Sequence, residues 1–150
     1  MKSRQSSEVR FLYHRTGFES AAGHHVRSKM ESVVCDWLMH HSIAHRHASE
    51  MFTVRVGVAG SPTVYVPDII LHDKDSAGRT VIIEPFDAYT PRQGSTRIIA
   101  CFRKEMKKEY FIVVVVKKQH MKKVLKDAYD LLIDFDNLDR LEDQLPLPDR

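Results

Sequence analysis

The hydrophobic residues of the chain follow the period of a helix in some segments and the period of a strand in others. Between about residues 26 and 45 the apolar residues recur at helical spacing. The segment 51–58 instead alternates apolar and polar residues, as a half-buried strand does. Two further strands are expected at about 63–71 and 80–85, joined by a polar, hairpin-like connection.

The second half of the chain begins with another helical pattern, over about 95–109, in which Ile98 and Phe102 belong to one apolar stripe. The next segment, 110–116, reads YFIVVVV, which is typical of a central strand buried on both faces. A last helix is expected at about 124–132. The order α-β-β-β-α-β-α predicts an α/β protein with a central mixed β-sheet flanked by helices.

Length and composition fit one domain of an ordinary soluble protein, with 150 residues, 43% hydrophobic and 29% charged. We expect an N-terminal extension over 1–25, a core domain over 26–135 and an acidic C-terminal tail over 136–150. No apolar run is long enough for a membrane span, and the first residues do not resemble a signal peptide. Cys35 and Cys101 have no CxxC spacing, so buried thiols in a reducing cytoplasm are expected.

Charge is distributed unevenly, although the net charge is only +3. Residues 103–123 are rich in lysine and arginine, whereas residues 127–149 are mostly acidic. This asymmetry is compatible with one face that binds a polyanion, and equally with two ordinary solvated faces.

Two acids stand in strands where a carboxylate is costly. Asp68 lies within YVPDIIL and Glu84 follows Val81-Ile82-Ile83. Burial of such a group needs a partner charge, hydrogen bonds or a metal ion. Pro67 distorts its strand, because proline has no N–H for the ladder. If the two strands form an antiparallel hairpin, the two carboxylates meet, and oxygen ligands of this kind favour Mg²⁺ or Mn²⁺.

These acids and the order of elements resemble the PD-(D/E)XK nuclease superfamily over about residues 26–132. Pro67-Asp68 matches the Pro-Asp pair of the second strand, Glu84 matches the acid of the third strand, and Glu31 in VRSKMESVVCDWL fits the acid of the first helix. The resemblance implies a restriction-endonuclease-like fold. It also implies a metal-dependent nuclease, expected to be an endonuclease, that hydrolyses DNA with Mg²⁺ or Mn²⁺ held by these three acids.

The lysine of the superfamily pattern is absent, because Phe86 stands in its place. In one interpretation the lysine has moved to the following helix, as in the helicase-linked branch that MKKEY resembles. Lys107 is then the first candidate for the charge stabiliser and Lys104 the second. In the other interpretation catalysis has been lost, and the chain is an inactive module that binds DNA or a protein partner.

The resemblance implies DNA as the partner, bound through its backbone by basic side chains near the site. The candidates are Arg92, Arg97, Arg103, Lys108, Lys117 and Lys118. A chain of this size is expected to act as a homodimer or in a larger DNA-processing complex if it cuts both strands. An RNA-processing enzyme of similar fold stays open as well.

Histidines gather at the end of the first helix, in HHSIAHRH. His41 and His45 are four residues apart, a spacing that can hold zinc on a helix. No third ligand has convincing spacing, so an exposed, helix-ending cluster is expected, with Cys35 in the core.

Overall fold

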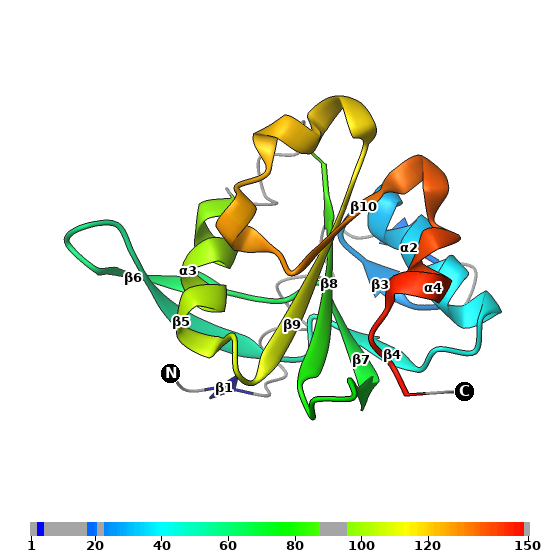
Figure 1. Ribbon diagram of the computed structural model, residues 1–150, viewed down its shortest axis with the longest axis horizontal. Helices are drawn as coiled ribbons and strands as arrows, with labels where there is room; N and C mark the ends of the chain where they lie inside the picture. The colour runs from blue at the N-terminus through cyan, green and yellow to red at the C-terminus, as the bar shows by residue number, and fades with distance from the viewer. Residues whose placement is uncertain (1–2, 5–17, 21–22, 88–95, 149–150) are drawn as a thin grey trace.

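The structure is a computed structural model that describes residues 3–4, 18–20, 23–87 and 96–148 (Figure 1). The main sheet contains β4 (His45–His47), β7 (Ile69–Lys74), β8 (Thr80–Phe86), β9 (Tyr110–Val116) and β10 (Leu131–Asp134), in the order β10-β9-β8-β7-β4. A second sheet joins β1 (Ser3–Arg4), β5 (Met51–Val56) and β6 (Ser61–Tyr65), and a third pairs β2 (Phe18–Glu19) with β3 (His25–Val26). The helices are α2 (Lys29–His40), α3 (Thr96–Met106) and α4 (Arg140–Gln144), with short 3-10 turns η2 (Lys118–Lys123), η3 (Lys126–Ala128) and η4 (Phe135–Asn137).

The main sheet is mixed, as the order of patterns predicts. β10, β9 and β8 run parallel, whereas β7 and β4 are antiparallel to their neighbours. α3 makes the crossover between β8 and β9. The expected α/β architecture with a central mixed sheet is therefore confirmed.

Alternating residues of the central strands build two separate cores. On one face, Ile69, Ile83 and Val113 pack with residues of α2 and α4. On the other face, Ile82 and Val114 pack with residues of α3. Figure 1 shows α2 and α4 on one side of the sheet and α3 on the other. The continuous apolar run of β9 is thus explained, since this strand is covered on both faces.

α2 is shorter than the helix expected over 26–45. Its N-cap is Ser28, whose hydroxyl accepts a hydrogen bond from the Glu31 N–H at 3.1 Å. The helix ends at His40, and Ser42 adopts a positive φ of 57° in the turn that follows. His45–His47 then form β4 rather than a helical end.

The strand expected over 63–71 is two strands. The chain leaves β6 at Tyr65 and enters β7 at Ile69, so Pro67 and Asp68 lie in the interruption. Pro67 cannot donate to a ladder, and at this point the chain passes from the second sheet to the main one. Asp68 therefore lies directly before β7.

The strand expected over about 80–85 is present, and it continues past Pro85 by one residue. β8 continues to Phe86, where the parallel ladder with β9 pairs Phe86 with Val116. The pairing of β8 with β7 extends only to Ile83 on that side, so the missing N–H of Pro85 removes no bond to β7.

The helix expected over 124–132 is also wrong. That segment contains the turn η3 and the first residues of β10, which pairs in parallel with β9. Asp130 fixes this arrangement, because its carboxylate accepts a hydrogen bond from the Ile112 N–H at 2.8 Å. A side chain that bonds to the neighbouring strand competes with helix formation.

Two residues of the expected acidic C-terminal segment, 136–150, pack into the core. Leu141 and Leu145 are buried on the α2 face of the sheet. Most of the predicted N-terminal extension, 1–25, lies outside the described residues. In the described part of the chain, none of the helices has the length and apolar character that a bilayer crossing needs.

Candidate functional site

Asp68 and Glu84 lie side by side in the interior, with only 1% and 5% of their surfaces exposed. The backbone N–H of Asp68 donates to Oε1 of Glu84 at 3.2 Å, and the Tyr65 hydroxyl donates to the same oxygen. The hairpin of β7 and β8 produces this contact, since Ile69 pairs with Ile83. The predicted proximity of the two acids is confirmed, whereas their role as metal ligands stays a prediction.

Glu31 joins these acids through Arg27. The Arg27 guanidinium forms an ion pair with the Asp68 carboxylate, and the backbone N–H of Arg27 donates to Glu31 Oε2 at 3.4 Å. Glu31 lies in the first turn of α2 with 1% of its surface exposed. Its other oxygen, Oε1, is buried and has no hydrogen-bond partner among the described residues.

In this acid cluster (Glu31, Asp68 and Glu84), burial and neighbouring charge disfavour the ionised form of two carboxyl groups. Burial, reinforced by the charge of Asp68, raises the pKa of Glu84 well above its usual value. Burial and then the Asp68 charge likewise raise the pKa of Glu31 to about 10, although Arg27 opposes both shifts. Arg27 thus offsets the charge of all three acids, and Glu31 Oε1 has no hydrogen-bond partner among the described residues. A hard divalent cation fits this oxygen-rich donor set.

Arg27 was not predicted as a site residue. Its position four residues before Glu31, directly ahead of the N-cap, was the available signal in VRSKME. Nothing in that spacing shows that its side chain turns toward Asp68, because the contact spans 41 positions of the chain.

Lys104 and Lys107 lie near the opposite end of the sheet from the acid cluster. Both are exposed and lie close to the C-terminus of α3. Two residues after Lys107, the carbonyl of Glu109 accepts a hydrogen bond from the N–H of Thr80 at the start of β8. Glu84 is four residues further along the same strand, about 13 Å at the rise of a strand. The structure records no contact between either lysine and the acids, so their catalytic role stays a prediction.

The six predicted DNA contacts occupy different parts of the molecule. Arg92 lies outside the described residues. Arg103 is held in an ion pair with Asp130 at 2.8 Å. Arg97 is exposed in the first turn of α3, where its guanidinium lies near Gly57.

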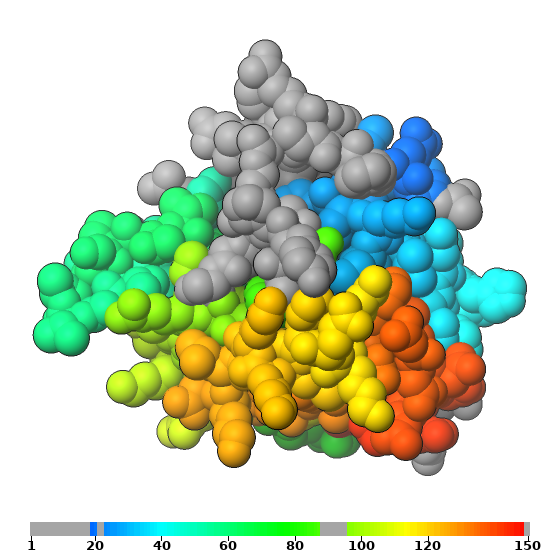
Figure 2. All heavy atoms as spheres, turned by 90° about the horizontal axis from the view of Figure 1, so that it is seen from above, coloured from blue at the N-terminus to red at the C-terminus, as the bar shows by residue number. Residues whose placement is uncertain are grey.

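Lys117 and Lys118 lie at the same end of the sheet as the acid cluster. They are exposed and follow β9 directly, where Val116 pairs with Phe86. Figure 2 looks onto this end, with the segment of η2 and η3 in yellow and orange. Lys108 is exposed too, but it precedes β9 and so lies at the other end. The register thus separates two groups of lysines.

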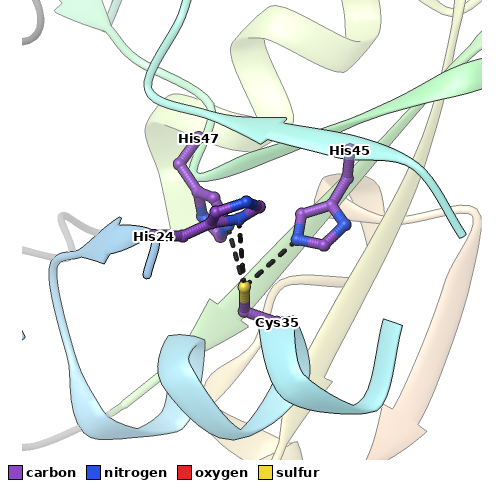
Figure 3. A group of neighbouring side chains, drawn as sticks. All are labelled: His24, Cys35, His45 and His47. Atoms are coloured by element: carbon purple, nitrogen blue, oxygen red, sulfur yellow. Dashed lines mark hydrogen bonds between the residues drawn. The ribbon is translucent and has the colours of Figure 1, made fainter. Parts of the chain in front are cut away.

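A second cluster was not predicted. The side chains of His24, Cys35, His45 and His47 meet beside the acid cluster, and their ligand atoms lie within 4.8 Å of one another. In the described part of the chain, no other group of three or more His, Cys, Asp or Glu side chains is as close. We call these four residues the His/Cys cluster. Figure 3 shows its three imidazoles turned toward the sulfur of Cys35.

The expectation of an exposed, helix-ending histidine group is wrong for His45 and His47. Both lie on β4, two residues apart and therefore on one face of the strand, and both are half-buried. His41 is not part of the cluster, because it stacks on Trp37 and bonds to the carbonyl of that residue at 2.8 Å. The helical spacing of His41 and His45 was misleading, since the helix ends before His45.

Burial favours the uncharged forms of Cys35, His45 and His47. It lowers the pKa of His47 to about 3, with the charges of His45 and His24 acting in the same direction. It also lowers the pKa of His45 and raises the pKa of the Cys35 thiol. Neutral imidazoles of this kind have a lone pair free to accept a hydrogen bond or bind a metal.

One hydrogen bond connects the two clusters. Nδ1 of His47 lies 3.0 Å from Oε2 of Glu31, while Nε2 of the same ring lies 3.2 Å from Sγ of Cys35. Glu31 is therefore linked to Asp68 through Arg27 and to the His/Cys cluster through His47.

Comparison with protein families, curated proteins and solved structures found no match to this chain. The function must therefore be inferred from the geometry of the two clusters.

Proposed function

We propose that the chain has a restriction-endonuclease-like fold and acts as a metal-dependent nuclease that hydrolyses DNA. The observation that supports this is the meeting of Glu31, Asp68 and Glu84. They come from α2, from the interruption before β7 and from β8, and all are buried. Carboxylates concentrated at one place are unfavourable unless a cation offsets their repulsion. Mg²⁺ or Mn²⁺, held by these oxygens, supplies a Lewis acid for the phosphodiester and an activated water.

The chain itself contributes orientation and charge. The Tyr65 hydroxyl and the Asp68 N–H both donate to one oxygen of Glu84, so this carboxylate is fixed before any ligand arrives. The Arg27 guanidinium contacts Asp68 directly, and it takes the place of the missing lysine in this proposal. A guanidinium there stabilises negative charge that develops on a phosphate.

DNA approaches the same end of the sheet in this proposal. Lys117 and Lys118 are exposed there, only a few residues beyond the register position of Glu84. Their contacts are with the phosphate backbone, so binding is expected to be salt-dependent and largely independent of sequence.

The test compares wild type with Asp68→Asn, Glu84→Gln and Arg27→Ala on supercoiled plasmid in Mg²⁺ or Mn²⁺. We expect the two acid variants to lose at least about 100-fold in rate, because each removes a charged ligand, and Arg27→Ala to lose about 10- to 100-fold. Asp73→Asn is the matched control, since this exposed acid lies at the far end of β7. Circular dichroism checks that every variant is folded.

Equal cleavage by wild type and both acid variants would remove the basis of the proposal. Absence of cleavage by wild type with either metal, on duplex or single-stranded DNA, would do the same. Single-stranded and duplex RNA as further substrates test the related RNA-processing enzyme.

An inactive module that binds DNA is the second candidate, and one observation favours it. Arg27 already neutralises Asp68 by a direct ion pair, and Phe86 replaces the lysine of the superfamily pattern. This candidate predicts DNA binding that persists in Asp68→Asn without cleavage by any variant. The nuclease predicts that the same substitution abolishes cleavage while binding is retained.

A further inference from the structure

The His/Cys cluster has the dimensions of a metal site. Sγ of Cys35 lies 3.4 Å from Nδ1 of His24, 3.2 Å from Nε2 of His45 and 3.2 Å from Nε2 of His47. Bonds of 2.3 Å to sulfur and 2.0–2.1 Å to nitrogen in a tetrahedron separate sulfur from nitrogen by roughly 3.5 Å. The observed distances differ from this by a few tenths of an ångström, which small side-chain rotations can supply.

Hydrogen bonding alone does not account for the convergence. A thiol has one proton to donate and is a weak acceptor, yet three imidazole nitrogens and the hydroxyl of Ser20 surround this one sulfur. The three rings are also drawn together, with His45 and His47 centroids 4.9 Å apart. Four ligand atoms around one centre are what a tetrahedral ion requires.

We propose that His24, Cys35, His45 and His47 bind one Zn²⁺ ion as a structural centre. One thiolate and three neutral imidazoles form a donor set that suits zinc rather than Mg²⁺, which takes oxygen ligands. All four positions are filled by protein, and Cys35 is fully buried, so no position is left for water or substrate. The thiol releases its proton to solvent when the metal binds.

The site joins three segments that are separate in the sequence. His24 directly precedes the short strand β3, Cys35 lies in α2, and His45 and His47 lie on the edge strand β4. Zinc would therefore fasten the N-terminal strands and the sheet edge to α2.

The outer contacts are those of a metal-bound histidine. Nδ1 of His47 bonds to the Glu31 carboxylate, and Nδ1 of His45 lies 2.9 Å from the carbonyl of Ile43. The rings of His45 and His47 thus hold Nδ1 against an acceptor and present Nε2 to the sulfur. This inference does not depend on the proposed nuclease activity, although Glu31 links the two.

The experiment measures metal in the full chain, expressed without a histidine tag and purified without chelators. We expect about one zinc per chain by elemental analysis. After exchange to Co²⁺ we expect the intense visible spectrum of a tetrahedral ion with a thiolate charge-transfer band. Cys35→Ala loses that band, whereas His24→Ala binds Co²⁺ more weakly with an altered spectrum. Cys101→Ser and His25→Ala are matched controls that keep wild-type zinc and spectra.

Cys35→Ala removes a buried side chain and can fail to fold, so His24→Ala and the wild-type melt provide independent readouts. Chelation of wild type is expected to lower the melting temperature, and added Zn²⁺ to restore it. Wild type with little zinc after reconstitution, or zinc retained in both His24→Ala and Cys35→Ala, would overturn the proposal. Asp68→Asn keeps its zinc if this centre is separate from the nuclease site, so the two proposals can fail separately.

Discussion

Glu84 illustrates at the residue scale how one side chain can be favourable for chemistry and unfavourable for folding. It is almost fully buried and adjacent to Asp68, and both burial and that charge raise its pKa. Its hydrogen bonds with Tyr65 and the Asp68 N–H use one oxygen as an acceptor, which an amide can replace.

The variant Glu84→Gln is therefore expected to be more stable than wild type in magnesium-free buffer at neutral pH. Glutamine keeps both hydrogen bonds and removes the cost of either protonating or burying a charged carboxylate at neutral pH, which should raise the free energy of unfolding by about 1–2 kcal/mol. Urea denaturation measures the difference. Glu105→Gln, an exposed acid on α3, is the matched control and should change stability by less than about 0.5 kcal/mol. A Glu84→Gln protein that is less stable than wild type would show that the carboxylate is already compensated.

Individual site residues could be predicted only where the neighbouring residues in the sequence indicate a buried or helix-starting position. Asp68 and Glu84 stand out because each interrupts an apolar strand, and Glu31 because it opens an amphipathic helix. Arg27, His24 and His47 carry no such mark. They reach their partners across sheets and helices, so only the assembled fold brings them together.

At the scale of elements, Arg103 and Asp130 fasten the last strand to the crossover helix. Asp130 accepts from the Arg103 guanidinium with one oxygen and from the Ile112 N–H with the other, both at 2.8 Å. α3, β9 and the start of β10 are thus joined by one carboxylate. The Arg103 guanidinium therefore serves to hold these elements together, and it is not free to bind a ligand at the surface.

Arg103→Ala is accordingly expected to lower the free energy of unfolding by about 1–3 kcal/mol, because it leaves a partly buried carboxylate without its partner. Chemical denaturation followed by circular dichroism gives the value. Lys104→Ala, the exposed neighbour, should be close to neutral. If Arg103→Ala instead keeps wild-type stability and weakens DNA binding, the original assignment of Arg103 as a DNA contact is the better one.

Elements with a strong and continuous pattern were predicted well, and those defined by side-chain contacts were not. The apolar run of β9 and the stripe of α3 depend on burial alone, and both are present. The helix expected near residue 128 is replaced by a turn and a strand, because Asp130 bonds to β9. β4 was not predicted, and His45 was placed at the end of a helix, because these three residues form a strand only by pairing with β7.

At the scale of the whole molecule, the parallel register divides the lysines between two ends of the sheet. Lys117 and Lys118 lie at the end that holds the acid cluster, whereas Lys104 and Lys107 lie near the other end. A DNA backbone that reaches the acids, as proposed, is therefore expected to contact the first pair rather than the second.

The double variant Lys117→Ala/Lys118→Ala is expected to weaken DNA binding and to reduce the slope of log affinity against log salt by about 1.8, because two phosphate contacts are lost. Fluorescence anisotropy at several salt concentrations measures both quantities. Lys104→Ala/Lys107→Ala is the matched control, with the same change in charge and little expected effect. A larger loss of DNA binding in this second variant would place DNA on the α3 face. It would also support the hypothesis that the motif lysine has moved to that helix.

Through its hydrogen bond to His47, Glu31 takes part in both proposed metal sites, which have different ligand preferences. Selection on either site then constrains the other. A glutamate-to-aspartate change that suited the oxygen-rich site would shorten its reach to the imidazole, and a change that suited the imidazole would alter the charge beside Asp68. A substitution at Glu31 therefore affects both sites, and improvement of one site requires compensating changes in the other.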